Sequence, residues 1–184
     1  PAEPLYTAVD AEGALGLQRT ADYGESVDLG VGHELVFHPA GHLLGAASAL
    51  IAFGDGAHRR RVLFSGDVGR YDDDFMADPA PPRGAVDYLL VESTYGNRTH
   101  PKDDLDEQLA RVVLGTVDRG GILLVPAFAV GRTQEVLFRL ARIEHAGRIP
   151  VLDVYVDSPM AVDATEIYRR FSRDLNFDWS KTPT

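Results

Sequence analysis

The pattern of apolar residues changes near Gly96, and this change most constrains how the chain can fold. Up to that point, short apolar runs alternate with glycine-rich turns, which predicts β-strands at residues 27–29, 34–37, 48–53, 61–64 and 86–91. The turn Gly54-Asp55-Gly56 separates two of these runs, so we expect them to form an antiparallel hairpin. A short helix is expected from Asp10, as its N-cap, to Leu17. The first part of the chain therefore predicts a mainly antiparallel sheet.

After Gly96, helical patterns alternate with short apolar runs. Residues 103–116 predict an amphipathic helix, and two further helices are expected at 132–145 and 159–171. Ser158 is suited to cap the last of these helices, with Pro159 as its first residue. The wholly apolar run 122–125 predicts a buried parallel strand, residues 151–156 predict another strand, and the helices between them predict crossover connections. We expect Leu105, Leu109, Val112 and Val113 on one helix face.

The two patterns together predict an α/β protein with two domains, at residues 1–97 and 98–184. Net charge is −10, which argues against a surface that binds nucleic acid through bulk charge alone. No apolar run approaches the ~20 residues that a membrane span needs, and no signal peptide is recognisable. We therefore expect a soluble, cytoplasmic protein.

Three consecutive strand or loop ends carry a side chain that can bind metal or transfer protons: His42, Asp67 and Glu92. They are about 25 residues apart, the length of one strand-turn-strand unit, so they are expected at one edge of the sheet. His42 and Asp67 each have an ordinary alternative, since a lone histidine between strands is often structural and a lone aspartate often caps a turn. There are no cysteines, so imidazole and carboxylate ligands would suit Zn²⁺, Mn²⁺ or Fe.

Two strand-to-helix loops, at residues 126–132 and 157–160, place backbone N–H groups at a helix start. Such positions favour anions such as phosphate, and Arg132 could add a fork of donors there. The alternative is an ordinary helix start with a solvated arginine. Neither loop has the glycine spacing of a P-loop or of a dinucleotide fingerprint.

Five segments, in this order, resemble the β-CASP branch of the metallo-β-lactamase superfamily. They are AGHLLGAA at 40–47, LFSGDVGR at 63–70, VESTYGNRTH at 91–100, GGILLVPAFAVGRTQE at 120–135 and VYVDSPMAVDAT at 154–165. The resemblance implies part of a metallo-β-lactamase αββα sandwich, followed by part of a β-CASP domain with a parallel sheet and crossover helices.

The resemblance also implies a role for each candidate residue. His42 would bind one of two zinc ions and Asp67 would bridge both. Glu92 would be an acid that pairs with a later histidine, itself the general acid for the leaving oxygen. Arg132 and Ser158 are the candidate phosphate contacts.

The family's HxHxDH signature, which supplies most zinc ligands, is absent from this sequence. It is expected upstream of Pro1, and the later β-CASP histidines beyond Thr184, so we interpret the chain as an internal piece. On this interpretation the piece alone does not hold a complete dinuclear site. His38 and His100 stand where the family often has histidine, and we interpret both as structural.

The function that this resemblance implies is zinc-dependent hydrolysis of RNA phosphodiester bonds in RNA processing or decay. Cleavage would be endonucleolytic, and 5′ exonuclease activity could accompany it. The partner would be single-stranded RNA. A homo-oligomer is compatible with the sequence. One alternative is a non-catalytic β-CASP subunit that binds RNA or partners, which would be expected to lose metal ligands. The other is a small-molecule metallohydrolase, against which the βαβ-type second domain argues.

Overall fold

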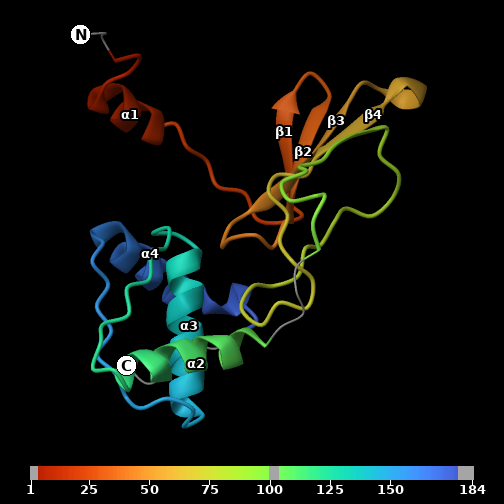
Figure 1. Ribbon diagram of the computed structural model, residues 1–184. Helices are drawn as coiled ribbons and strands as arrows, with labels where there is room; N and C mark the ends of the chain where they lie inside the picture. Colours follow the sequence, from red (N-terminus) through yellow and green to blue (C-terminus); the bar gives the residue numbers. More distant parts are fainter. Residues whose placement is uncertain (1–3, 100–103, 178–184) are drawn as a thin grey trace.

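The computed structural model describes residues 4–99 and 104–177 of the chain. One part is a five-stranded sheet, and the other is a group of three helices (Figure 1). The strands are β1 (Ser26–Gly30), β2 (His33–Pro39), β3 (Ala47–Phe53), β4 (Arg60–Phe64) and β5 (Tyr88–Leu90). The helices are α1 (Ala8–Leu15), α2 (Leu105–Val117), α3 (Arg132–His145) and α4 (Pro159–Arg170), with 3₁₀ turns η1 (Gly56–His58) and η2 (Ser172–Asp174). The fold is thus mixed α/β, as the sequence predicts.

The sheet has the strand order β1-β2-β3-β4-β5. The expected hairpin between β3 and β4 is confirmed, with Leu50 opposite Leu63 in an antiparallel ladder. Burial alternates along β3, so that Leu50 and Ala52 face the core. Strand β5 pairs with β4 in parallel rather than antiparallel. The long connection after Phe64 brings the chain back to the end of the sheet where β4 begins, so both strands run in the same direction (Figure 1). Arg61 fixes this connection, since its Nη1 donates to Ala85 O at 2.8 Å.

The N-cap of α1 lies three residues earlier than expected, and the helix ends at Leu15 and not at Leu17. Its N-cap is Thr7, whose hydroxyl accepts from the backbone N–H of Asp10, while the Asp10 carboxylate accepts from the backbone N–H of Thr7 at 2.8 Å. Asp10 is therefore the third helical residue of a capping box and not the cap itself. No residue of α1 is buried, and Figure 1 shows the helix apart from the rest of the fold.

Helices α2, α3 and α4 pack through two apolar clusters. The first contains Phe75, Met76, Phe138, Tyr168 and Leu175, and joins the loop after β4 to α3 and α4. The second contains Ala110, Val113, Ile143 and Ile149. Helix α4 starts as predicted, with Ser158 as N-cap and Pro159 in its first turn.

The buried face of α2 agrees with the expectation only in part, since Val113 is buried and Leu109 packs against the second cluster. Asp106, Ala110 and Val113 are its buried residues, whereas Leu105 and Val112 are 42% and 52% exposed. The physical reason is that α3 places arginines against this face, and Asp106 forms an ion pair with Arg139 at 3.1 Å.

The expected strands at 122–125 and 151–156 do not form within the described part of the chain. Both segments are extended, and neither pairs with a strand of the sheet. Ile122 is 87% exposed and Val151 is 85% exposed, because no neighbouring strand covers them. The expected parallel sheet with crossover helices is therefore represented here by its helices. None of the helices in the described ranges combines the length and the apolar composition needed to cross a membrane.

Candidate functional site

Two loops at the end of the sheet approach each other closely. Gly41 and Val68 form an isolated antiparallel bridge, and the N–H of Gly69 donates to Ala40 O at 2.7 Å. A Cβ atom on Gly69 would lie 1.9 Å from Gly41 O. Gly41 has a φ of +69°, and a Cβ there would lie 2.7 Å from Ala77 O. Glycine at 69 therefore allows the loop with Asp67 to contact the loop with His42, and glycine at 41 allows the His42 loop to contact the segment at Ala77.

Glu92 joins the second of these loops through its carboxylate. Its Oε2 accepts from Thr94 N at 2.8 Å, and its Oε1 accepts from Val68 N at 3.3 Å. These backbone N–H donors, Thr94 first and then Val68, hold the pKa of the Glu92 carboxyl below its usual value. The nearby His42 lowers the same pKa by a smaller electrostatic contribution. The carboxylate is therefore ionised at neutral pH and fixed against the backbone of the loop that carries Asp67.

Ser65 supports this arrangement, and sequence reasoning did not single it out. The backbone N–H of Glu92 donates to Ser65 Oγ at 2.9 Å, and Ser65 N donates to Leu90 O at 2.9 Å. The buried Ser48 donates its hydroxyl to Ser65 O at 2.6 Å. The available signal was a small hydroxyl residue at the end of an apolar strand, directly before Gly66 and Asp67.

The expectation that His42, Asp67 and Glu92 lie at one edge of the sheet thus agrees with the loop contacts. His42 and Asp67 are exposed and Glu92 is half-buried. Imidazole and carboxylate are donors that zinc accepts, but a structural zinc site needs four ligands and a catalytic one usually needs three from protein. Within residues 4–99 and 104–177, no group of three or more such side chains could hold a metal ion. These residues therefore fit part of a metal site.

Two further histidines, His38 and His100, stand at positions where the resemblance places histidine. His38 lies in β2 opposite Ser48 and is half-buried in the sheet. His100 lies outside the described residues.

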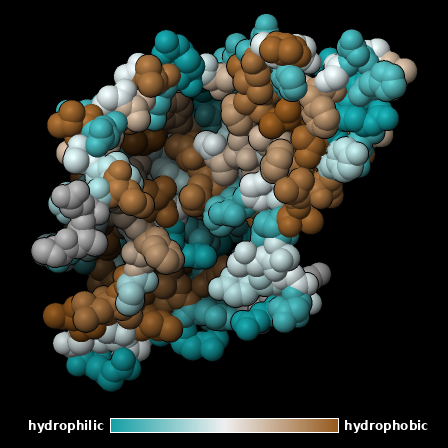
Figure 2. Space-filling model, turned by 90° about the horizontal axis from the view of Figure 1, so that it is seen from above, coloured by the Kyte–Doolittle hydropathy of each residue, from teal (hydrophilic) through white to brown (hydrophobic). Residues whose placement is uncertain are grey.

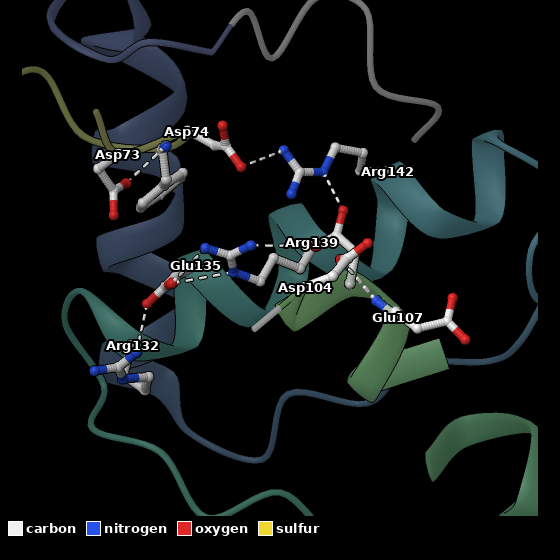
Figure 3. A network of polar contacts seen from close by, with 10 residues as sticks. Asp73, Asp74, Asp104, Glu107, Arg132, Glu135, Arg139 and Arg142 are labelled. Carbon is white, nitrogen blue, oxygen red and sulfur yellow. Dashed lines mark hydrogen bonds and ion pairs between the residues drawn. The ribbon is translucent and has the colours of Figure 1, made fainter. Parts of the chain in front are cut away.

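Arg132 and Ser158 lie at the N-termini of α3 and α4. Arg132 Nη1 donates to Glu135 Oε2 at 2.6 Å, at one end of a chain of ion pairs along α3 (Figure 3). Ser158 Oγ accepts from Ala161 N at 3.2 Å as the helix cap. The Arg132 side chain is 57% exposed, and a hydroxyl that accepts can still donate.

Gln134 connects the two helix starts and is completely buried. Its Nε2 donates to Ala129 O at 3.0 Å and to Thr165 Oγ1 at 3.0 Å, and its Oε1 accepts from Gly131 N at 2.7 Å. The loop before α3 is therefore held against α4. Sequence reasoning included Gln134 in a matching segment without giving it a role.

The chain of ion pairs continues through Asp106 to the loop after β4. Arg139 and Arg142 both face Asp106, and Arg142 Nη1 also donates to Asp74 Oδ2 at 3.0 Å (Figure 3). Burial would raise the pKa of the Asp106 carboxyl, but Arg142 and Arg139 outweigh it and keep this pKa below its usual value. The network therefore ties α2, α3 and the loop at 71–78 together.

The sheet and the helices also meet directly at the loop with His42. Leu43 packs on Gly131, where a Cβ atom would lie 2.2 Å from Leu43 Cδ2. The backbone N–H of Leu44 donates to the hydroxyl of Tyr168 at 3.2 Å. The candidate metal-binding loop thus contacts both α4 and the loop before α3.

A hollow of about 1000 Å³ lies behind this loop, lined by Tyr23, Phe37, Leu43, Leu44, Phe171 and Arg173 among others. Figure 2 shows a hollowed face of the molecule with apolar side chains around it. His42, Asp67 and Glu92 do not line it. The candidate site is therefore separate from this hollow.

Comparison with known proteins finds one domain match and several similar nucleases and termination factors. The Beta-Casp domain model matches residues 133–183. Ribonuclease TTHA0252 of Thermus thermophilus is 40% identical over 93% of this chain, which spans 38% of that relative. Transcription termination factor FttA of Methanosarcina mazei is 40% identical over 87% of the chain and 25% of the relative. Endoribonuclease YSH1 of Yarrowia lipolytica is 32% identical over 94% of the chain and 20% of the relative.

The chain thus spans less than two fifths of the length of these relatives. The matches extend over both the sheet and the helices, including the three loops described above. Residues 133–183 thus match a β-CASP domain, and along most of its length the chain is similar to proteins named ribonuclease, transcription termination factor and endoribonuclease.

Proposed function

We propose that the whole protein is a metal-dependent ribonuclease that hydrolyses RNA phosphodiester bonds in RNA processing or decay. The observation that supports this most is the ionised Glu92, held by backbone N–H groups beside the loops of His42 and Asp67. Similar proteins named ribonuclease and endoribonuclease support the same class of reaction. On this proposal, residues 1–97 belong to the metallo-β-lactamase domain and residues 98–184 to the β-CASP domain.

His42 and Asp67 are proposed to provide two of the ligands for a pair of zinc ions, with further ligands from outside these three loops. Bound zinc would supply a nucleophile at neutral pH and stabilise charge on the phosphate. The chain's own contribution is to hold one imidazole and one carboxylate on two loops that Gly69 allows to touch.

Glu92 is proposed to orient a proton donor and not to bind metal. Its carboxylate already accepts from two backbone N–H groups, and its lowered pKa keeps it anionic at neutral pH. The proton donor would be the later histidine that the family resemblance implies. The Glu92 carboxylate beside that histidine would favour its protonated ring, which is the form that donates a proton to a leaving oxygen.

Arg132 and Ser158 are proposed to contact the phosphates of single-stranded RNA. Arg132 has five N–H donors and gives one of its nitrogens to Glu135, so further donors remain for a phosphate. Ser158 lies at a helix N-terminus, where an anion is stabilised. We further propose that the enzyme acts in the cytoplasm, mainly as an endonuclease, and that a homo-oligomer is compatible with these roles.

The second candidate is a non-catalytic β-CASP subunit that binds RNA or a partner. It is favoured by one observation, namely that the described residues contain no group of three or more potential metal ligands. Similarity to proteins named transcription termination factor is also compatible with it. A small-molecule metallohydrolase is the third, against which the Beta-Casp match argues.

The test uses the whole protein with two substrates over saturating ranges: 5′-labelled single-stranded RNA and a hydroxyacyl thioester. The proposal predicts internal cuts in the RNA and no thioester turnover. RNA that is bound and left intact would favour the non-catalytic subunit. Thioester turnover without RNA cleavage would show that the fold carries a different substrate specificity.

A further inference from the structure

The loop that carries His42 is closed by its own backbone. Ala40 N donates to Ala46 O at 3.0 Å, and Ala46 N donates to Leu43 O at 2.9 Å. Tyr23 adds a contact from the sheet side, since its hydroxyl donates to Ala46 O at 3.0 Å. These bonds define the loop's ends, whereas His42 lies exposed within it. The orientation of His42 therefore depends on what holds the residues on either side.

Both neighbours of His42 are held, each by a different part of the fold. Gly41 pairs with Val68 on the sheet side. On the other side, Leu43 packs on Gly131, and the next residue donates its backbone N–H to Tyr168. A shift of the helices relative to the sheet would therefore move the backbone next to His42.

Tyr168 is itself fixed, so its hydroxyl is a rigid acceptor. The side chain is 2% exposed and stacks on Phe75 with a centroid distance of 5.8 Å and an interplanar angle of 3°. Burial raises the pKa of the Tyr168 phenol, which keeps it neutral at physiological pH. Phenylalanine would fill the same apolar space, so the hydroxyl contributes its contact with the loop.

We propose that Tyr168 is a positioning residue: from α4, its hydroxyl holds the backbone of Leu44 and thereby sets the orientation of His42. The inference rests on the proposed function, in which His42 binds a catalytic metal. It assigns to the β-CASP part a second task besides contacting RNA, which is to fix a ligand of the metallo-β-lactamase part. Gly131 is part of the same contact, because a Cβ atom there would lie 2.2 Å from Leu43 Cδ2 and would displace that side chain.

The test compares Tyr168→Phe with Tyr155→Phe in the whole protein. Tyr155 is 86% exposed, so its variant removes a hydroxyl without touching the loop. Loss of one hydrogen bond predicts a kcat for single-stranded RNA about two- to tenfold lower in Tyr168→Phe, with unchanged KM. Hydrogen exchange of the peptide covering 40–47 should become faster by a similar factor. Tyr155→Phe should change neither quantity.

A merely structural role gives a different result. If Tyr168→Phe lowers the melting temperature but keeps the wild-type kcat per folded molecule, the inference is wrong. Unchanged exchange at 40–47 also overturns it. Leu43→Ala provides a second variant, since it removes the contact with Gly131 and should increase exchange at the same peptide. If the wild type cleaves no RNA, the proposed function is wrong, and the role of Tyr168 in catalysis is wrong with it. If the wild type is active and Tyr168→Phe has the same kcat, only the inference about Tyr168 is wrong.

Discussion

Gly69→Ala is the substitution whose effect follows most directly from the geometry of the site. The new Cβ would lie 1.9 Å from Gly41 O and 2.8 Å from His42 N, whereas ordinary contact begins at 3.4 Å. The two loops must therefore separate by about 1.5 Å, which breaks the bond from Gly69 N to Ala40 O. Overpacking of this kind costs about 1–3 kcal/mol of stability. A displacement near 1 Å can cost about 100-fold in rate.

The assay measures kcat/KM on single-stranded RNA and the thermal unfolding of the whole protein. Gly13→Ala is the matched control, because nothing lies within 4 Å of a Cβ at this position in α1. The control should keep wild-type activity, and alanine should favour the helix by up to about 1 kcal/mol. Wild-type activity together with an unchanged melting temperature in Gly69→Ala would refute the close approach of the two loops.

Two further predictions concern charge. Asp106→Ala leaves Arg139 and Arg142 without their shared carboxylate, so the free energy of unfolding in urea should fall by about 3–5 kcal/mol. Arg111→Ala, which removes a 74% exposed arginine, should change it by less than about 0.5 kcal/mol, and equal losses would contradict the buried network. Because the pKa of Glu92 is lowered by folding, its stabilisation is present above the unfolded value of about 4.3 and is lost as pH falls through the folded value. Glu92→Gln should thus be less stable than wild type at pH 7, with a difference that shrinks below about pH 4; a difference independent of pH would show that the carboxylate's charge does not matter.

Local signals predicted much of the fold. The Gly54-Asp55-Gly56 turn between two apolar runs gave the β3–β4 hairpin, and Ser158 before Pro159 gave the start of α4. These features depend on residues adjacent in sequence, whose backbone preferences are known. Helix α1 shows the limit of this reasoning, since both Thr7 and Asp10 can cap a helix and only the reciprocal bonds decide between them.

Features that depend on distant partners were not predictable in the same way. The apolar runs at 122–125 and 151–156 indicate a preference for burial, but a strand also needs a neighbour, and none pairs with them in the described ranges. On α2 the helical period predicted the packing of Leu109 and Val113, but not the burial of Asp106, which depends on the arginines of α3.

The same holds within the site. The positions of His42, Asp67 and Glu92 after apolar strands were visible in the sequence, because strand ends share one edge of a sheet. The backbone donors that fix Glu92, and the contact of Tyr168 with Leu44, were not visible in the sequence. The latter two residues are 124 positions apart and meet only after the helices pack. Tyr168 also follows an ordinary helical period on α4, with buried Ala161 and Ala164, and so reads as a core residue.

The central claim is that the loop contacts between His42, Asp67 and Glu92 build one side of a catalytic metal site. The most direct measurement is metal content and cleavage of 5′-labelled single-stranded RNA by the whole protein and by Asp67→Asn. Asp163→Asn, at an exposed position on α4, is the control. The account predicts about two zinc ions and internal cleavage for wild type and control, with both properties reduced in Asp67→Asn. An Asp67→Asn protein with wild-type metal content and wild-type cleavage would contradict it.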